Sequence, residues 1–309
     1  MDSENSRKDF YQHTGPSAHL IEGVRRLLDL AVWEDNDTRG DITSAALVPD
    51  TARGRAAVTV REEGVVAGVV VADRVLAAVD ASLVWEPKIE DGASVVPGDV
   101  IGIIAGPVRT MLTAERILLN MLGHLSGIAT LTRAYVREIA GTGAHLYDTR
   151  KTTLGWRYLE KYAVRCGGGR NHRTGLFDAI LIKDNHLAFI DEEGFSPAEA
   201  VRRAAAYAAG HCASSGELPL IEVEVDSLEQ LKNVLAAEPD IVLLDNMTPE
   251  TLREAVALRD AAGSAARLES SGGVNLKTIR AIALSGVDRI SVGALTHSAR
   301  SLDIGLDWV

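Results

Sequence analysis

The chain has 309 residues, a hydrophobic fraction of 46% and a formal net charge of -11. This length and apolar content are enough for a full-sized core, which excludes general disorder. The excess of acidic residues and the pI near 5.2 argue against a nucleic-acid or membrane-surface binder, because such proteins need broad Lys and Arg coverage.

The only two cysteines are Cys166 and Cys212, which is typical of a reduced intracellular compartment and offers no disulfide framework or zinc spacing. The first twenty residues carry mixed charges and lack the apolar core of a signal peptide. The longest apolar run, residues 65–72, is too short to cross a bilayer. We therefore expect a cytoplasmic protein that binds neither membrane nor nucleic acid.

The first half of the chain predicts a small sheet with one or two helices. Residues 21–32 show an apolar period of 3.6 and predict a helix. Short β-rich runs follow at 53–72 and 82–106, with Gly and Pro at the turns. Residues 95–101 also resemble the hammerhead of biotinyl and lipoyl carrier domains. However, Lys88 lacks the setting of a carrier lysine, and turn chemistry alone accounts for the Pro-Gly-Asp step.

A long apolar segment then separates this half from a region with a different hydrophobic pattern. Residues 113–140 are apolar on nearly every face and predict a buried helix, broken near Ser126 and Gly127. Beyond them, short apolar strands alternate with amphipathic helices, which indicates a parallel sheet and, by its repetition, an α/β barrel. Such barrels carry their chemistry at the carboxyl ends of the strands. Polar groups follow six successive strands: residues 148–151, Lys183, Glu224, Asp245, residues 270–273 and Gly293.

Residues 148–173 concentrate positive charge, with seven Lys or Arg and one His against two acids. Arg offers a planar fork for carboxylate or phosphate, and Lys a compact point charge. Several such groups at one mouth would repel each other unless an anion of comparable charge joined them. The alternative is a solvated helix face, to which we assign Arg157, Lys161 and Arg170. The candidates for anion binding are Arg150, Lys151, His172, Arg173 and Lys183.

A turn rich in small residues predicts a phosphate site. Ser271 and Gly272 follow a strand and precede a predicted helix at 275–286, and Gly293 lies on the next loop. Small residues allow backbone N–H groups to approach a phosphate, and a helix amino terminus adds partial positive charge. Taken alone, however, a Gly-Gly turn is usually only a turn.

Two carboxylates, Glu224 and Asp245, end adjacent strands. They are either salt-bridge partners of the nearby cations, or they hold ribose hydroxyls, bind Mg²⁺ and face a developing positive charge. A polyphosphorylated sugar, a second anionic substrate and Mg²⁺ together indicate transfer at an anomeric carbon, through an oxocarbenium-like transition state.

Seven motifs resemble, in chain order, the quinolinate phosphoribosyltransferase family: DTRKTT, EKYAVRCGGGRNHR, IKDNH, EVEVDSLEQL, LLDN, LESSGGV and GVDRISVGALTHS. The resemblance runs from about residue 112 to 306, and DITS at 41–44 fits it. It implies that quinolinate and phosphoribosyl pyrophosphate are converted, with Mg²⁺, into nicotinate mononucleotide, pyrophosphate and CO2 in NAD synthesis.

The resemblance also implies a fold and an assembly. A small N-terminal α/β sandwich would span residues 1–127 and be completed by the tail, residues 297–309. An incomplete α/β barrel of about seven strands, as in type II phosphoribosyltransferases, would span residues 128–296. The subunits would form a homodimer, and a hexamer is the alternative assembly. Arg116 would reach the quinolinate carboxylates of the neighbouring subunit.

The site residues implied by the resemblance fall into three groups. Quinolinate and the phosphates would contact Arg150, Lys151, His172, Arg173 and Lys183. The ribose and the metal would contact Glu224 and Asp245, which with Lys151 make the catalytic set. The 5'-phosphate would contact Ser271, Gly272 and Gly293.

Two alternatives stay open from the sequence. An enzyme of the same fold could act on another pyridine-type acceptor, or the chain could be a sugar-phosphate binder without catalysis. Residues 209–219 look longer than usual for a connection between βα units, so we expect a surface excursion that could touch the mouth of the site.

Overall fold

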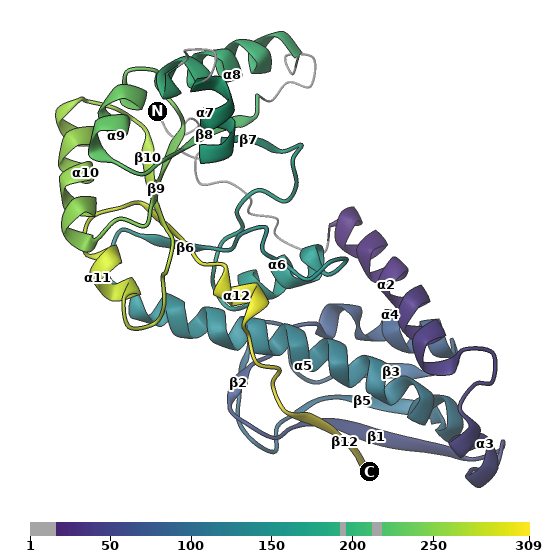
Figure 1. Ribbon diagram of the computed structural model, residues 1–309. Coiled ribbons are helices and arrows are strands. Elements are labelled where there is room, and N and C mark those ends of the chain that lie inside the picture. Colours follow the sequence, from purple (N-terminus) through teal and green to yellow (C-terminus); the bar gives the residue numbers. More distant parts are fainter. Residues whose placement is uncertain (1–16, 192–195, 212–217) are drawn as a thin grey trace. The chain divides into compact units, whose positions relative to one another are not determined.

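A computed structural model describes residues 17–191, 196–211 and 218–309 (Figure 1). The chain divides into two compact units built from segments that alternate along the sequence. We call the first the barrel unit; its described part comprises residues 135–150 and 170–293 apart from the gaps. The described part of the second, the sandwich unit, comprises residues 17–134, 151–169 and 294–309.

The barrel unit is built on a parallel sheet of six strands in the order β6-β11-β10-β9-β8-β7. The strands are β6 (His145–Tyr147), β7 (Ala179–Ile182), β8 (Leu220–Val225), β9 (Ile241–Asp245), β10 (Arg267–Ser271) and β11 (Arg289–Ser291).

Within the described residues this is one strand fewer than the seven or so expected. The backbone at Arg170 partly replaces the missing strand, because it forms a parallel bridge with Tyr147 beside β6. The amide of Arg170 donates to the carbonyl of Leu146, and the amide of Asp148 donates to the carbonyl of Arg170. The incomplete α/β barrel predicted from the sequence is confirmed.

Helices follow most strands and lie on the outside of the sheet (Figure 1). Side-chain caps start two of them: Ser227 accepts from the amide of Gln230, and Thr248 accepts from the amide of Thr251. Helices α8, α9 and α10 pack successively against their neighbours. The helices are α7 (Asp184–Asp191), α8 (Pro197–His211), α9 (Leu228–Leu235), α10 (Pro249–Ala261) and α11 (Ile279–Ala283).

Side chains that point into the barrel form layers, because alternate residues of a strand share a face. The lowest layer contains the buried cluster of Ala179, Leu220 and Ile241. Two residues further along the strands, the middle layer contains Glu222 and Glu269, both fully buried. The next residues on the same faces are Glu224 and Ser271, so the top layer coincides with the carboxyl ends of the strands.

The sandwich unit contains an antiparallel sheet in the order β12-β1-β5-β3 and a two-stranded pair, β2-β4. The C-terminal strand β12 pairs with β1 over five residues. The strands are β1 (Arg53–Val60), β2 (Gly64–Val65), β3 (Val84–Pro87), β4 (Ser94–Val95), β5 (Val100–Pro107) and β12 (Ile304–Trp308). The helices are α2 (Ala18–Asn36), α3 (Ile42–Leu47), α4 (Val69–Val79), α5 (Val108–Glu138), α6 (Arg157–Cys166) and α12 (Ala294–His297). The last residues of α5, from Tyr135 on, belong to the barrel unit.

The turn that resembles a carrier-domain hammerhead connects β4 to β5. Gly98 adopts a φ of 96° there, and the carboxylate of Asp99 accepts from the amide of Val96. Lys88 forms an ion pair with Glu86. These local contacts account for the motif by turn chemistry.

Some expectations about α5 and α6 differ from the structure. The helix expected to break near Ser126 and Gly127 is continuous as α5, because Ser126 instead bonds the backbone of Ala67. Lys161, expected on a solvated face, is buried, since α6 packs both of its sides. Arg157 and Arg170, also assigned to that face, are both half-buried, and Arg170 lies beyond the end of α6. Arg157 Nε donates to the hydroxyl of Thr152.

In the described residues, no helix combines the length and the apolarity that crossing a membrane requires. Of the segment 209–219, residues 212–217 lie outside the described residues, so its expected excursion stays a prediction.

Candidate active site

The polar groups that follow the strands lie along one edge of the parallel sheet. Strands β7, β8, β9 and β10 are consecutive neighbours, so Lys183, Glu224, Asp245 and Ser271 follow one another around this edge. Asp245 and Ser271 are direct partners in the register of β9 and β10. Because parallel strands end on the same side, the predicted gathering of these strand ends is confirmed. We call this edge the rim.

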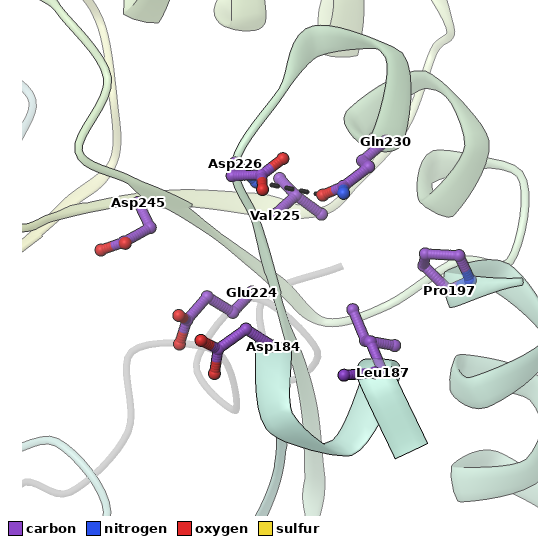
Figure 2. A pocket seen from close by; sticks show the side chains of 9 residues that line it. Asp184, Leu187, Pro197, Glu224, Val225, Asp226, Gln230 and Asp245 are labelled. Atoms are coloured by element: carbon purple, nitrogen blue, oxygen red, sulfur yellow. Dashed lines mark hydrogen bonds between the residues drawn. The ribbon is translucent and has the colours of Figure 1, made fainter. Parts of the chain in front are cut away.

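An acidic cavity of about 410 Å³ opens at the rim beside β8 and β9. Figure 2 shows the carboxyl groups of Asp184, Glu224 and Asp245 directed to one side of the strands, whereas Asp226 is turned toward Gln230. The amide of Asp226 donates to Gln230 Oε1 over 3.1 Å. Carboxylate oxygens in such a group are hard donors of the kind Mg²⁺ prefers.

Lys183 and Glu224 form an ion pair at the rim. Lys183 Nζ lies 2.9 Å from Glu224 Oε2, with 45% of the lysine side chain exposed and 12% of the glutamate. The structure thus shows, for Glu224, the salt bridge that the sequence left open. An anion binding here would compete with Glu224 for the ammonium group, while a metal ion would compete with Lys183 for the carboxylate.

The turn after β10 brings backbone atoms close together. Gly272 has a φ of 90°, and a Cβ atom there would lie 2.1 Å from Asn246 Oδ1. Only glycine adopts this positive φ readily and leaves room for Asn246 without a shift of the chain. Asn246 is held in turn by its amide, which donates to the carbonyl of Ser271.

The helix predicted to follow this turn is shorter than expected. It begins at Ile279 rather than Asn275 and has five residues, because the side chains of Asn275 and Thr278 bond local backbone groups in a turn. A helix amino terminus therefore does not directly follow Gly272 and Gly273. Gly293 directly follows Ser291 and Val292 at the end of β11.

Asp148 links the two ends of the cationic segment. This buried carboxylate accepts from Asn171 Nδ2 and from the amide of His172, each over 2.7 Å. Arg150 lies two residues beyond Asp148, and Arg173 lies one residue beyond His172. Through Asp148, the backbone segments that carry Arg150 and Arg173, two of the predicted anion-binding arginines, are therefore held close together beside β6.

His172 is buried and faces two carboxylates. Its Nε2 lies 3.1 Å from Glu222 Oε2 and 3.4 Å from Glu269 Oε1. Burial by itself would lower the pKa of this imidazole, but the charges and hydrogen bonds of Glu222 and Glu269 outweigh it and raise the pKa to about 9.

A third contact of the ring has the opposite effect. The amide of Arg173 donates to His172 Nδ1 over 2.8 Å, which favours the neutral ring. The effect of two buried carboxylates close to Nε2 on the pKa is larger than the effect of one bond from an adjacent amide, since interactions with full charges are stronger than neutral hydrogen bonds. The two carboxylates therefore hold the pKa of His172 above its ordinary value.

Two predicted residues belong to the sandwich unit. Lys151 is exposed, and its carbonyl accepts from the hydroxyl of Thr296 over 2.7 Å. Arg116 is exposed on α5 and lines a cavity of about 620 Å³ together with His124, Trp156 and Arg300. The roles that the resemblance gives to both residues stay predictions.

Comparison with known proteins agrees with these observations. The family described as Quinolinate phosphoribosyl transferase, C-terminal domain, matches residues 128–307, and the corresponding N-terminal domain matches residues 41–126. The chain belongs to the quinolinate phosphoribosyl transferase family. The family prediction made from the seven sequence motifs is confirmed.

Individual members of this family match over nearly the whole chain. The carboxylating nicotinate-nucleotide pyrophosphorylase of Mycobacterium leprae is 46% identical over 290 residues, which are 93% of this chain and 98% of that protein. A protein described as a probable enzyme of the same name from Bacillus subtilis is 40% identical, with 92% and 93% covered. The solved nicotinate-nucleotide pyrophosphorylase of Francisella tularensis is 40% identical, has a TM-score of 0.83, and is matched over 93% of this chain and 96% of its own.

The sequence interpretation missed four acidic residues of this region. Asp184 and Asp226 line the acidic cavity, and each directly follows a residue or strand already singled out, so adjacency could have indicated them. Glu222 and Glu269 lie inside apolar strands two residues before rim positions. An acid within a buried strand is the signal that could have found them.

Proposed function

We propose that the protein transfers the phosphoribosyl group of phosphoribosyl pyrophosphate to quinolinate, giving nicotinate mononucleotide, pyrophosphate and CO2 for NAD synthesis. It would thus be a pentosyltransferase. Relatives named for this activity, which cover 92% and 93% of the chain, support the reaction. The observation in this chain that carries the proposal is the rim, where Lys183, two carboxylates and a glycine turn lie at neighbouring strand ends.

Quinolinate has two carboxylates, and Arg150, Arg173 and Arg116 are suited to them because a guanidinium binds a carboxylate through two parallel bonds. Lys151 and Lys183 would bind phosphate oxygens as point charges. The backbone at Ser271, Gly272 and Gly293 would bind the 5'-phosphate. In the described part of the chain, no atom lies within 4 Å of a Cβ added at Gly273, which favours this role. Ribose hydroxyls would donate to Glu224 and Asp245.

The carboxylates of the acidic cavity fit the Mg²⁺ ion that the family implies. Glu224 and Asp245 would hold it, with Asp184 and Asp226 in the same cavity and with pyrophosphate oxygens completing its oxygen coordination. A bound ion would neutralise charge on the departing pyrophosphate.

The predicted site residues would promote both stages of the reaction. As the ring nitrogen of quinolinate attacks the anomeric carbon, the bond to the pyrophosphate oxygen breaks and the sugar gains positive charge, which Glu224 and Asp245 stabilise. Lys151 and Lys183 stabilise the leaving pyrophosphate. The pyridinium ring then accepts the electron pair of the carbon–carbon bond when the adjacent carboxylate leaves as CO2. A proton from solvent replaces it on that ring carbon.

The proposal includes an assembly and a compartment. The protein would act as a homodimer, in which Arg116 of one subunit reaches quinolinate in the other, and the exposed position of Arg116 on α5 is compatible with this. We place the protein in the cytoplasm, which its two widely spaced cysteines support.

The proposal is tested by incubating the purified protein with quinolinate, phosphoribosyl pyrophosphate and Mg²⁺. We expect CO2 and nicotinate mononucleotide in equal amounts, measured by trapped radioactive CO2 and by chromatography. Arg150→Ala should raise the KM for quinolinate, whereas the exposed control Arg253→Ala on α10 should not. Absence of both products from correctly folded protein would reject the proposal.

The choice of acceptor separates this proposal from its closest alternative. A phosphoribosyltransferase for another pyridine would accept an acceptor with one carboxylate, such as nicotinate, as well as or better than quinolinate. The number of cations around Asp148 and the rim favours the dicarboxylate. A sugar-phosphate binder without catalysis would instead bind phosphoribosyl pyrophosphate and release no pyrophosphate with either acceptor.

A further inference from the structure

The middle layer of the barrel is charged. Glu222 of β8, Glu269 of β10 and Arg289 of β11 are each at most 2% exposed. Arg289 Nε lies 2.5 Å from Glu269 Oε2, and its guanidinium stacks on the ring of Tyr147, 3.6 Å from the centroid. His172 completes this cluster through its contacts with both glutamates. The interior layers of barrels usually contain branched apolar residues, and buried ion pairs give little net stability.

The side chains of this cluster pair with one another without a metal ion. One ligand atom from each of His172, Glu222 and Glu269 lies within 4.8 Å of the others, so these residues could hold a cation by distance alone. However, the guanidinium of Arg289 already pairs with Glu269, and His172 already contacts both carboxylates. A divalent ion would have to displace these contacts in a buried site, which is unfavourable.

The cluster is attached to the backbone that carries Arg173. The His172 ring is held by Glu222 of β8 and Glu269 of β10, and the His172 amide is held by Asp148, directly after β6. Arg173 Nη1 donates to the carbonyl of Ala179 in β7 over 3.2 Å. Two consecutive residues are thus fixed to four strands of the barrel unit, on the side where the six-stranded sheet does not close on itself.

We propose that Glu222 and Glu269 are positioning residues, which hold the His172 ring from the middle layer and thereby fix the place at which Arg173 meets the carboxylates of the acceptor. The inference rests on the proposed function for the identity of the acceptor. Both glutamates are at most 2% exposed, which leaves almost no surface for contact with substrate. Their effect passes through His172, so it falls on binding of the dicarboxylate and not on binding of phosphoribosyl pyrophosphate.

The test is steady-state kinetics of Glu222→Gln, in which the shape of the side chain is kept and its charge is lost. We expect the KM for quinolinate to rise about tenfold, since small misplacements of a binding group are costly, while the KM for phosphoribosyl pyrophosphate changes less than about twofold. Glu269→Gln should act in the same direction. If it does not fold, because Arg289 loses its carboxylate, Glu222→Gln decides, with Glu222→Asp as the milder second variant.

Asp288→Asn provides the matched control in the same barrel. Asp288 pairs with Arg259 and Arg267 over 2.8 and 3.0 Å and directly precedes β11, at the end of the sheet opposite the rim. This variant should lower the melting temperature and leave both KM values unchanged. A purely structural role for Glu222 predicts the same outcome for Glu222→Gln, and that outcome would overturn the inference.

A double-mutant cycle shows whether Glu222 acts through His172. In a His172→Ala background, Glu222→Gln should change the KM for quinolinate by less than about twofold, because the contact it alters is already gone. A full, multiplicative effect in that background would refute the positioning role. These results are separable from the proposed function: an inactive wild type refutes the function, whereas an active wild type with an unaltered Glu222→Gln variant refutes only the positioning role.

Discussion

Asp148 connects local sequence to the arrangement of the cations. It is fully buried, and one carboxylate oxygen takes a bond from Asn171 while the other takes one from the amide of His172. A carboxylate that satisfies two buried donors is costly to replace, because the donors lose their partners within the protein. Asp148 thus sets the distance between the segments 148–151 (DTRK) and 171–173 (NHR).

Replacing Asp148 by Asn should lower both stability and acceptor binding. One oxygen becomes a donor group, so one of the two donors is left unsatisfied, and the free energy of unfolding should fall by about 1–3 kcal/mol. Urea denaturation measures this loss, and kcat/KM for quinolinate should fall with it. Asp240→Asn is the control, since Asp240 accepts from the amide of Ile221 at the amino end of β8. An equal loss of kcat/KM in both variants would contradict a specific role for Asp148.

The titration of His172 predicts how stability depends on pH. Its pKa in the folded protein, about 9, is above the ordinary value of 6.5. The stabilising contribution is therefore complete below about pH 6.5 and is lost as the pH rises to about 9, by an amount on the order of 2–3 kcal/mol. Urea denaturation between pH 6 and pH 9.5 should show this decline in wild type and a flatter profile in His172→Gln. Parallel profiles would indicate the neutral ring that the Arg173 amide favours.

At the scale of elements, helix α5 shows why small residues need not end a helix. Its 31 residues run without a break past Ser126 and Gly127. A Cβ atom on Gly127 would lie 2.1 Å from the carbonyl oxygen of Arg300, in the segment that leads to β12. Gly127 thus allows the C-terminal segment to pass close to the helix, and this tertiary contact outweighs its low helix propensity.

Two glycines in helices should respond oppositely to substitution by Ala. Gly127→Ala should lower the free energy of unfolding by about 1–3 kcal/mol, because the added methyl group has no space. Gly210 lies in α8, where no atom of the described residues is within 4 Å of an added Cβ, so Gly210→Ala should raise the free energy of unfolding by about 0.5–1 kcal/mol. Thermal unfolding followed by circular dichroism measures both. A stabilising Gly127→Ala would show that the close approach to Arg300 is not retained in solution.

The rim could be predicted from the sequence because it depends on local pattern. A strand of apolar residues must end somewhere, and parallel strands end together, so Lys183, Glu224 and Asp245 were found from spacing alone. The middle layer could not be found in this way. Glu222 differs from Glu224 only in depth along the same strand face, and Lys161 is buried only because α6 has neighbours on both sides. Depth and neighbours are properties of the fold.

For the whole molecule, net charge and local charge have opposite signs. The chain carries -11 in total, yet seven cationic residues fall within residues 148–173. The outer surface therefore repels anions in general, while the segment that contains Arg150 and Arg173 attracts them. This contrast favours a small, highly charged substrate over an extended polyanion, because the latter would also meet the acidic surface.

Mixing two inactive variants tests the proposed sharing of Arg116 between subunits. Arg116→Ala removes the residue donated to the partner, and Glu224→Ala removes a rim carboxylate of the same chain, so each variant alone should be nearly inactive. After subunit exchange, half of the dimers are mixed and each has one intact site of two, so about a quarter of wild-type activity should return. If Arg116 serves the site of its own chain, every site in the mixture is defective. In that case no activity would return, and the proposed intersubunit contact would be wrong.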